Sequence, residues 1–132
     1  MRKLRKLCIV LSLLLVLSFF VAVPASAASL ITSYNGEIHD TGSLRITWSA
    51  STACNINVDQ GSITSTIQYK SGGSWTTIAI LSEYDTNTYV IFDGGNRNVS
   101  NAGEYRIKTT HFVREGTATQ IKSYTSPTIN VN

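Results

Sequence analysis

The residues that could perform acid–base or nucleophilic chemistry are few in this chain. The only histidines are His39 and His111, and hydrolysis would need one of them beside a nucleophile and an orienting acid. Asp40 follows His39 directly, but neighbours in a strand point to opposite faces, so the two are poorly placed to act as a pair. The carboxylates show no spacing typical of a glycosidase couple. We therefore predict no catalytic residue, and a hydrolase with an unrecognised site is the least favoured alternative.

Thiol and metal chemistry have equally little support. Cys8 lies in an apolar N-terminal segment, which leaves Cys54 alone in the rest of the chain. A dyad of Cys54 with a histidine is one alternative, but a lone cysteine in a polar segment is more often unreactive or forms an intermolecular disulfide. Two histidines and one cysteine lack the clustered spacing of zinc ligands, and segment 93–98 has one carboxylate beside an arginine, which argues against calcium. We predict no metal and no cofactor.

Aromatic side chains are better candidates, for a binding surface. After residue 27 there are too many of them for all to face a core, and exposed aromatics are typical of protein and sugar contacts. The four that we single out are Trp75, Phe112, Tyr69 and Tyr84. Trp75 follows closely after the predicted Gly72-Gly73 hairpin turn, where its side chain either binds a ligand or covers the end of the core. Phe112 breaks the alternation of its strand, and is either exposed beside Arg106 and Lys108 or turned inward by a bulge.

The first 27 residues have the three parts of an export signal. Basic residues at positions 2, 3, 5 and 6 precede an almost wholly apolar stretch, 7–23, and the small residues of 24–27 predict cleavage after Ala27. A retained membrane anchor is the alternative, since the apolar stretch is long enough to span a bilayer. We expect a secreted protein, 28–132, that leaves the membrane after cleavage. Export without an intrachain disulfide fits a bacterium.

Removing this segment reverses the charge balance. The whole chain has 11 basic and 8 acidic residues, but four of the basic ones lie in the signal, so the mature part has a net charge of −1. The pI of about 9.0 therefore describes the precursor and does not indicate nucleic acid or an anionic membrane as a partner. We expect an extracellular protein or glycan instead.

Alternating apolar and polar residues predict the strands that position the aromatic side chains. We expect strands at 44–49, 63–70, 75–81, 88–92, 101–113, 119–124 and 126–131. Asn35-Gly36 indicates a hairpin in segment 28–40, which is predicted as an N-terminal edge strand or ribbon, and Gly72-Gly73 indicates another hairpin between the second and third strands. Segments 50–62, 83–87 and 93–98 are polar and are predicted as loops, 50–62 alternatively as a short edge strand. The apolar run 88–92 is predicted to be buried on both faces.

Seven or so short strands with no helical period after residue 27 predict one all-β domain, a two-sheet antiparallel sandwich over 28–132 that is preceded by a cleaved signal-peptide helix. A small barrel such as an OB-fold is the alternative.

The sequence resembles immunoglobulin-like and fibronectin type III-like domains at several points. Gly103-x-Tyr105-x-Ile107 resembles the start of strand F, 43–50 resembles strand B, 67–75 is similar to the C to C′ hairpin and 126–131 to the last strand. The resemblance implies that the Tyr105 hydroxyl bonds to nearby backbone, and that Trp48 and Ile107 stand where antibody domains have their disulfide.

The chain also resembles small uncharacterised exported proteins of Gram-positive bacteria, which implies no activity. Our leading hypothesis is a secreted, non-enzymatic binding or interaction module for a protein or a cell-wall glycan. The alternative is a bacteriocin-like or inhibitor effector that acts by docking.

Overall fold

Six β-strands make up most of residues 28–132, the part of the chain that the computed structural model describes. The strands are β1 (Ile31–Asp40), β2 (Arg45–Ser71), β3 (Ser74–Asn98), β4 (Gly103–Glu115), β5 (Ala118–Thr125) and β6 (Ile129–Val131). All pairs are antiparallel, and within 28–132 there is no helix, so none that could cross a membrane. The expected signal helix and its cleavage site lie outside the described residues. The fold is all-β, as predicted.

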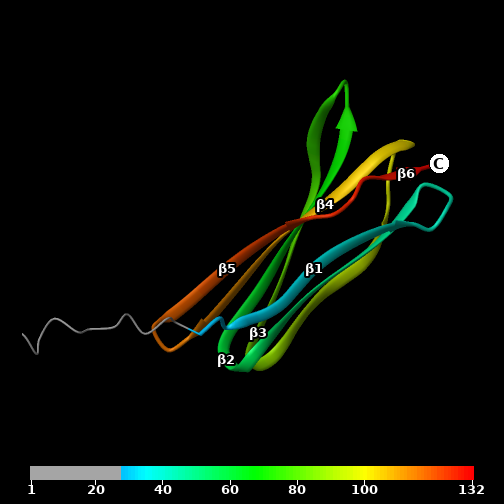
Figure 1. Ribbon diagram of the computed structural model, residues 1–132. Coiled ribbons are helices and arrows are strands. Elements are labelled where there is room, and N and C mark those ends of the chain that lie inside the picture. Colours follow the sequence, from blue (N-terminus) through cyan, green and yellow to red (C-terminus); the bar gives the residue numbers. More distant parts are fainter. Residues whose placement is uncertain (1–27) are drawn as a thin grey trace, which may run out of the picture.

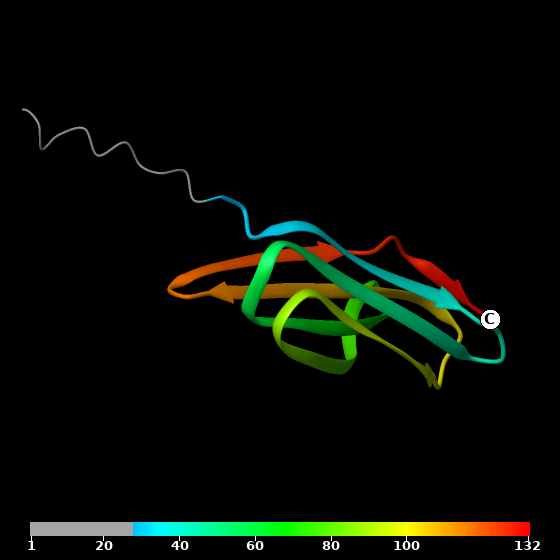
Figure 2. The ribbon, with the colours of Figure 1, turned by 90° about the horizontal axis from the view of Figure 1, so that it is seen from below.

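β2 organises the sheet, because its two halves have different partners. Its first half pairs with β1 and its second half with β4, while β3 follows it on the other side along both halves. β4 in turn pairs with β5 and then with β6. Figures 1 and 2 show the result, a curled half-barrel in which the long β2–β3 hairpin bends. The register shift between Ala53 and Val58 is the site of this bend. The strands form one continuous sheet, and two separate sheets are not seen.

The turn between β2 and β3 was correctly predicted, but three expected loops are strand. Gly72 and Gly73 have positive φ and join Ser71 to its partner Ser74. Segments 50–62 and 83–87 lie within β2 and β3, and 93–98 forms the end of β3, so their assignment as loops is wrong. For 50–62 the alternative of a strand is correct, although it is part of a long strand and not a short edge strand. Residues 83–87 can be polar because all of them are exposed.

The hairpin predicted at Asn35-Gly36 is also wrong, because both residues lie in the middle of β1. Asn35 uses its side-chain oxygen to accept hydrogen bonds from the backbone and hydroxyl of Ser51, its cross-strand partner. A Cβ on Gly36 would lie 2.7 Å from Cγ2 of Thr109, closer than real Cβ atoms approach. Glycine is therefore needed here for close approach of β1 to β4, and a turn is not the reason for it.

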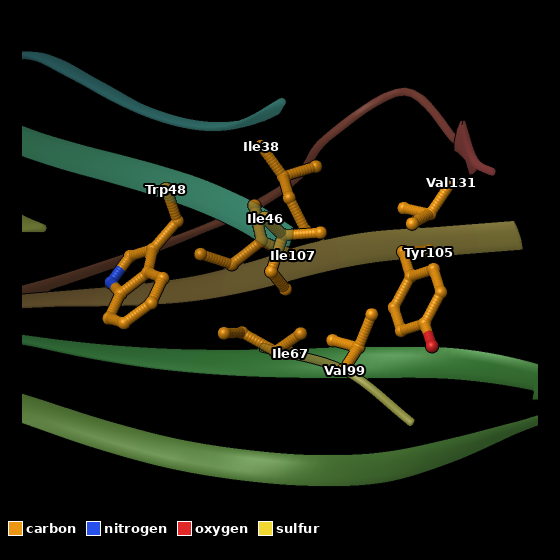
Figure 3. Packing of buried hydrophobic residues seen from close by; sticks show 8 residues of the cluster. All are labelled: Ile38, Ile46, Trp48, Ile67, Val99, Tyr105, Ile107 and Val131. Atoms are coloured by element: carbon orange, nitrogen blue, oxygen red, sulfur yellow. The ribbon is translucent and has the colours of Figure 1, made fainter. Parts of the chain in front are cut away.

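The core lies on the concave side of the sheet and is built by alternate residues of β1, β2 and β4. One apolar cluster, seen in Figure 3, consists of Ile38, Ile46, Trp48, Ile67, Val99, Tyr105, Ile107 and Val131. A second consists of Ile31, Ala50, Val58, Ile63, Ile91 and Val113. The indole of Trp48 covers Gly95, where a Cβ would lie 2.9 Å from the ring. Burial of these side chains is the main force that holds the curled sheet together.

The run 88–92 is not buried on both faces as predicted. Ile91 is buried, but Val90 and Phe92 are more than half exposed. The reason is that this part of β3 pairs only with β2 and has no layer over its outer side within residues 28–132.

Candidate functional site

A broad surface of hydroxyl-bearing side chains covers the convex side of the sheet where β3, β2, β4 and β5 run side by side. We call it the Ser/Thr face. Its members on β2 and β4 point away from the core, and its members on β3 and β5 are the cross-strand partners that share this side. On β3 these are Trp75, Thr77, Ile80, Ser82 and Tyr84, and on β2 they are Ser62, Thr64, Thr66, Gln68 and Lys70. On β4 they are Glu104, Arg106, Lys108, Thr110, Phe112 and Arg114, and on β5 they are Thr119, Ile121, Ser123 and Thr125.

One end of the Ser/Thr face is apolar. The register places Tyr84, Ser62, Phe112 and Ile121 in one row across four strands. Tyr84 is 55% exposed and Ile121 63%, while Phe112 between them is half-buried. The Gln60 amide donates to the Tyr84 hydroxyl, which holds that ring at the edge of the row. Phe112 is therefore exposed in part beside the basic residues of β4, the first of the two expected arrangements, and the pairing of β4 shows no bulge.

The other end of the Ser/Thr face is a cation–π cluster around Trp75. The guanidinium carbon of Arg106 lies 4.1 Å from the centre of the indole, and Lys70 Nζ lies 5.8 Å from it. Arg106 Nε also donates to Gln68 Oε1 at 2.8 Å, and Lys70 forms an ion pair of 2.7 Å with Glu104. Trp75 is thus partly covered by charged neighbours, and the contacts fix the orientation of Arg106.

Tyr69 lies on the opposite side of the sheet from the other three aromatics that the sequence singles out. Its ring packs against Tyr105 with centroids 5.0 Å apart, and it lines a hollow of about 160 Å³ together with Arg97 and Asn101. The structure therefore brings Trp75, Tyr84 and Phe112 to one face and separates Tyr69 from them.

No protein-family model matches the chain, and no curated protein is significantly similar to it. The proposed function therefore rests on the geometry of the described residues.

The three residues expected to be structural lie in the core. Tyr105 donates its hydroxyl proton to the carbonyl of Asn101 at 2.6 Å, the kind of contact that the resemblance to immunoglobulin-like domains implies. Burial is the main reason that the pKa of Tyr105 is raised. Trp48 and Ile107 belong to the same apolar cluster (Figure 3). The indole nitrogen of Trp48 is the one buried side-chain polar atom without a partner among the described residues.

A buried polar layer separates the two apolar clusters. His111 has no exposed surface, and its Nδ1 and Nε2 each lie 2.7 Å from a hydroxyl, those of Thr52 and Thr109. Beside it, Ser65 donates to the carboxylate of Asp93. Burial lowers the pKa of His111, so the ring is held neutral. Because the ring is enclosed, a substrate would have to open the core to reach it, and we assign this layer a structural role.

The remaining chemically capable residues are dispersed. His39 is exposed on β1, where its Nε2 lies 3.4 Å from Glu37. Cys54 is part-buried at the bend of β2, and burial raises its pKa, which disfavours the reactive thiolate. Among residues 28–132 no group of three or more His, Cys, Asp or Glu side chains could hold a metal ion.

Sequence reasoning missed the hydroxyl-bearing members of the Ser/Thr face. Their signal is visible in β2, where Ser62, Thr64 and Thr66 alternate with buried residues. It was overlooked because one strand supplies only a single row, and the face appears only when the register of four strands is known.

Proposed function

We propose that the protein is a secreted, non-enzymatic binding module that contacts an extracellular partner, a protein or a cell-wall glycan, through the Ser/Thr face. The observation that carries this proposal is the exposure of large apolar side chains along that face. Ile80 is 68% exposed, and it lies on the same side of β3 as Tyr84, four residues before it, opposite Thr66 of β2. Exposed apolar groups gathered on one side of a protein are typical of an interaction site.

Sedimentation with insoluble cell walls of Gram-positive bacteria tests this proposal. The full-length chain is expressed in an exporting host, and the exported product is purified and mixed with the walls. We expect the wild type to sediment with the walls and Tyr84→Ala/Phe112→Ala to stay largely in solution, because that variant removes the aromatic rings of one row. Tyr89→Ala/Phe92→Ala is the matched control, since it removes two exposed aromatics outside the face. Equal sedimentation of both variants and the wild type would refute the use of this face.

The same preparation tests export. The proposal includes cleavage after Ala27, which predicts an exported product that begins at Ala28 and has a net charge of −1. Mass spectrometry of the purified protein gives its N-terminus directly. A product that retains residues 1–27 would contradict this part of the proposal.

We further propose that the half-barrel is a variant of the immunoglobulin-like or fibronectin type III-like sandwich, in which β2 and β3 each supply two strands. Support comes from the partners of β2, which are β1 on one side of the bend and β4 on the other, and from the bond of Tyr105 to Asn101. In such a sandwich the strand directions of the two layers differ by about 30°. An experimental structure in which the two halves of β2 belong to layers at this angle would support the assignment, and a closed barrel would exclude it.

A further inference from the structure

The Ser/Thr face is positively charged although the part of the chain that carries it is not. Residues 28–132 contain seven of the 11 basic residues and all eight acidic ones. Four of the seven basic residues lie on the face, namely Lys70, Arg106, Lys108 and Arg114, with Glu104 as the one acidic residue. The face therefore has a net charge of +3, and the remainder of the described chain has −4. This separation makes the face complementary to an anionic ligand.

Three of the four basic residues form a row along β4. Arg106 and Lys108 are two positions apart and thus about 7 Å apart along the strand. Arg114 lies on the same side about 20 Å beyond Lys108, past Thr110 and Phe112. Lys70 is neutralised by its ion pair with Glu104, but no acidic residue of 28–132 forms an ion pair with the other three. The row therefore presents charge that is available to a partner.

Arg106 is held in place before any ligand arrives. Its Nε donates to Gln68, and its guanidinium lies over Trp75, whereas its two Nη groups form no hydrogen bond within the described residues. A guanidinium offers paired N–H groups that match the oxygens of a carboxylate or phosphate. Because its orientation is already fixed, less side-chain entropy is lost when such a group binds.

The neighbours of this basic row are hydroxyl groups. Thr64, Thr66 and Thr110 adjoin it on β2 and β4, and Ser123 and Thr125 adjoin it on β5. Each hydroxyl both donates and accepts hydrogen bonds, as the hydroxyls of a sugar do. Serine is depleted in protein–protein interfaces, so this composition favours a polyhydroxylated ligand over an acidic protein.

The dimensions of the face suit a polymer. The face extends along β2 from Ser62 to Lys70, which is about 26 Å at the rise of a strand, and it is four strands, about 15 Å, wide. It is a surface and not a pocket, with Tyr84 and Phe112 toward one end and Trp75 at the other. A small anion would contact only one part of it.

We propose that the Ser/Thr face binds an anionic polysaccharide, with its acidic groups along the basic row of β4 and its hydroxyls against the serine and threonine side chains. This inference rests on the proposed function and specifies the chemical class of its ligand.

A pair of matched polymers tests the inference. Polygalacturonate carries a carboxylate on each sugar, and its methyl ester has the same backbone without the charge. In affinity electrophoresis of the exported protein, we expect retardation by polygalacturonate that weakens as salt is added, because salt screens exposed charges. Retardation by the ester is expected to be much weaker. Equal retardation by the two polymers would overturn the inference.

A variant in which two basic residues are replaced tests whether the polymer binds at the Ser/Thr face. Lys108→Ser/Arg114→Ser is expected to bind polygalacturonate about three- to tenfold more weakly, the size expected for the loss of two exposed ion pairs. Arg45→Ser/Arg97→Ser removes the same charge outside the face and is expected to bind like the wild type. Equal losses in the two variants would overturn the inference, as would tighter binding of poly-glutamate or single-stranded DNA.

The two proposals can fail separately. If Tyr84→Ala/Phe112→Ala abolishes wall binding but Lys108→Ser/Arg114→Ser does not weaken polygalacturonate binding, the binding module stands and its anionic ligand is refuted. If the aromatic variant sediments like the wild type, the proposed function fails as well. Far-UV circular dichroism of all variants checks that they are folded.

Discussion

The two sides of β4 differ sharply although they alternate along one strand. The inner residues Tyr105, Ile107, Thr109, His111 and Val113 are buried, and His111 forms a hydrogen bond with Thr52 of β2. Of the outer residues, Lys108 and Arg114 are exposed and form no ion pair within the described residues, whereas Arg106 contacts Trp75 and Gln68. The difference teaches that the fold depends on one set and leaves the other free to change. Substitutions on the outer side are therefore expected to change stability little.

The largest expected effect is on the inner side. Trp48→Ala should lower the free energy of unfolding by about 3–5 kcal/mol, because it removes a buried aromatic ring and leaves a cavity above Gly95. Lys108→Ala on the outer side should change it by less than about 0.5 kcal/mol. Urea unfolding of both variants measures the difference. A loss of less than about 1 kcal/mol for Trp48→Ala would contradict the claim that stability depends on the inner side of the sheet.

A smaller effect is expected where β1 approaches β4. Gly36→Ala should cost about 1–3 kcal/mol, because the new methyl group would overlap the Thr109 side chain. Adding Thr109→Ser removes the methyl group in the way and keeps the hydroxyl that bonds His111, so it should recover part of this loss. A double-mutant cycle by urea unfolding gives the coupling energy. Independent, additive effects of the two changes would show that the contact is not tight.

The smallest expected effect is a dependence of stability on pH that His111 causes. Its pKa in the folded protein is lowered from the ordinary 6.5 by burial, so the unfolded chain binds more protons as the pH falls through that value. The stabilisation is complete above about pH 6.5 and is lost progressively below it. Urea midpoints at about pH 7.5 and about pH 5.5 should therefore differ more for the wild type than for His111→Gln. His39→Gln changes an exposed residue, so its two urea midpoints should differ as much as those of the wild type. An equal difference between the two midpoints in all three proteins would contradict this role of His111.

Much of the inner side could be predicted from sequence, because alternation of apolar residues reports burial within one strand. Ile46 and Trp48 were placed on a strand in this way, and the Gly72-Gly73 turn came from its residue types. Leu44, expected on the same strand, lies in the bend before β2 and has a positive φ. The passage of β2 through 50–62 could not be predicted, since polar residues there resemble a loop until their partners on β1 and β3 are known.

The site was harder to predict than the fold. Trp75, Tyr84 and Phe112 could be named as candidates from their residue type alone, but their common face depends on the register of β2 with β3 and β4. The same register separates Tyr69 from them. Arg106 and Lys108 were predicted to share one side of their strand with Phe112. The net positive charge of the whole face was not predicted, because Arg114 lay beyond the expected end of that strand and Lys70 joins the face only through the register of β2.

The length of β3 has a consequence for self-association. β3 pairs only with β2, so among the described residues one of its edges has unpaired backbone groups along 25 residues. An open edge can template the addition of strands from other molecules, which leads to aggregation. The register shift between Ile67 and Gln68 leaves Ile78 of β3 as an extra residue and interrupts this edge, and the bend of the hairpin between Ala53 and Val58 keeps the edge from being flat. The irregularities that bend the sheet thereby also hinder the stacking of one molecule's edge onto the next.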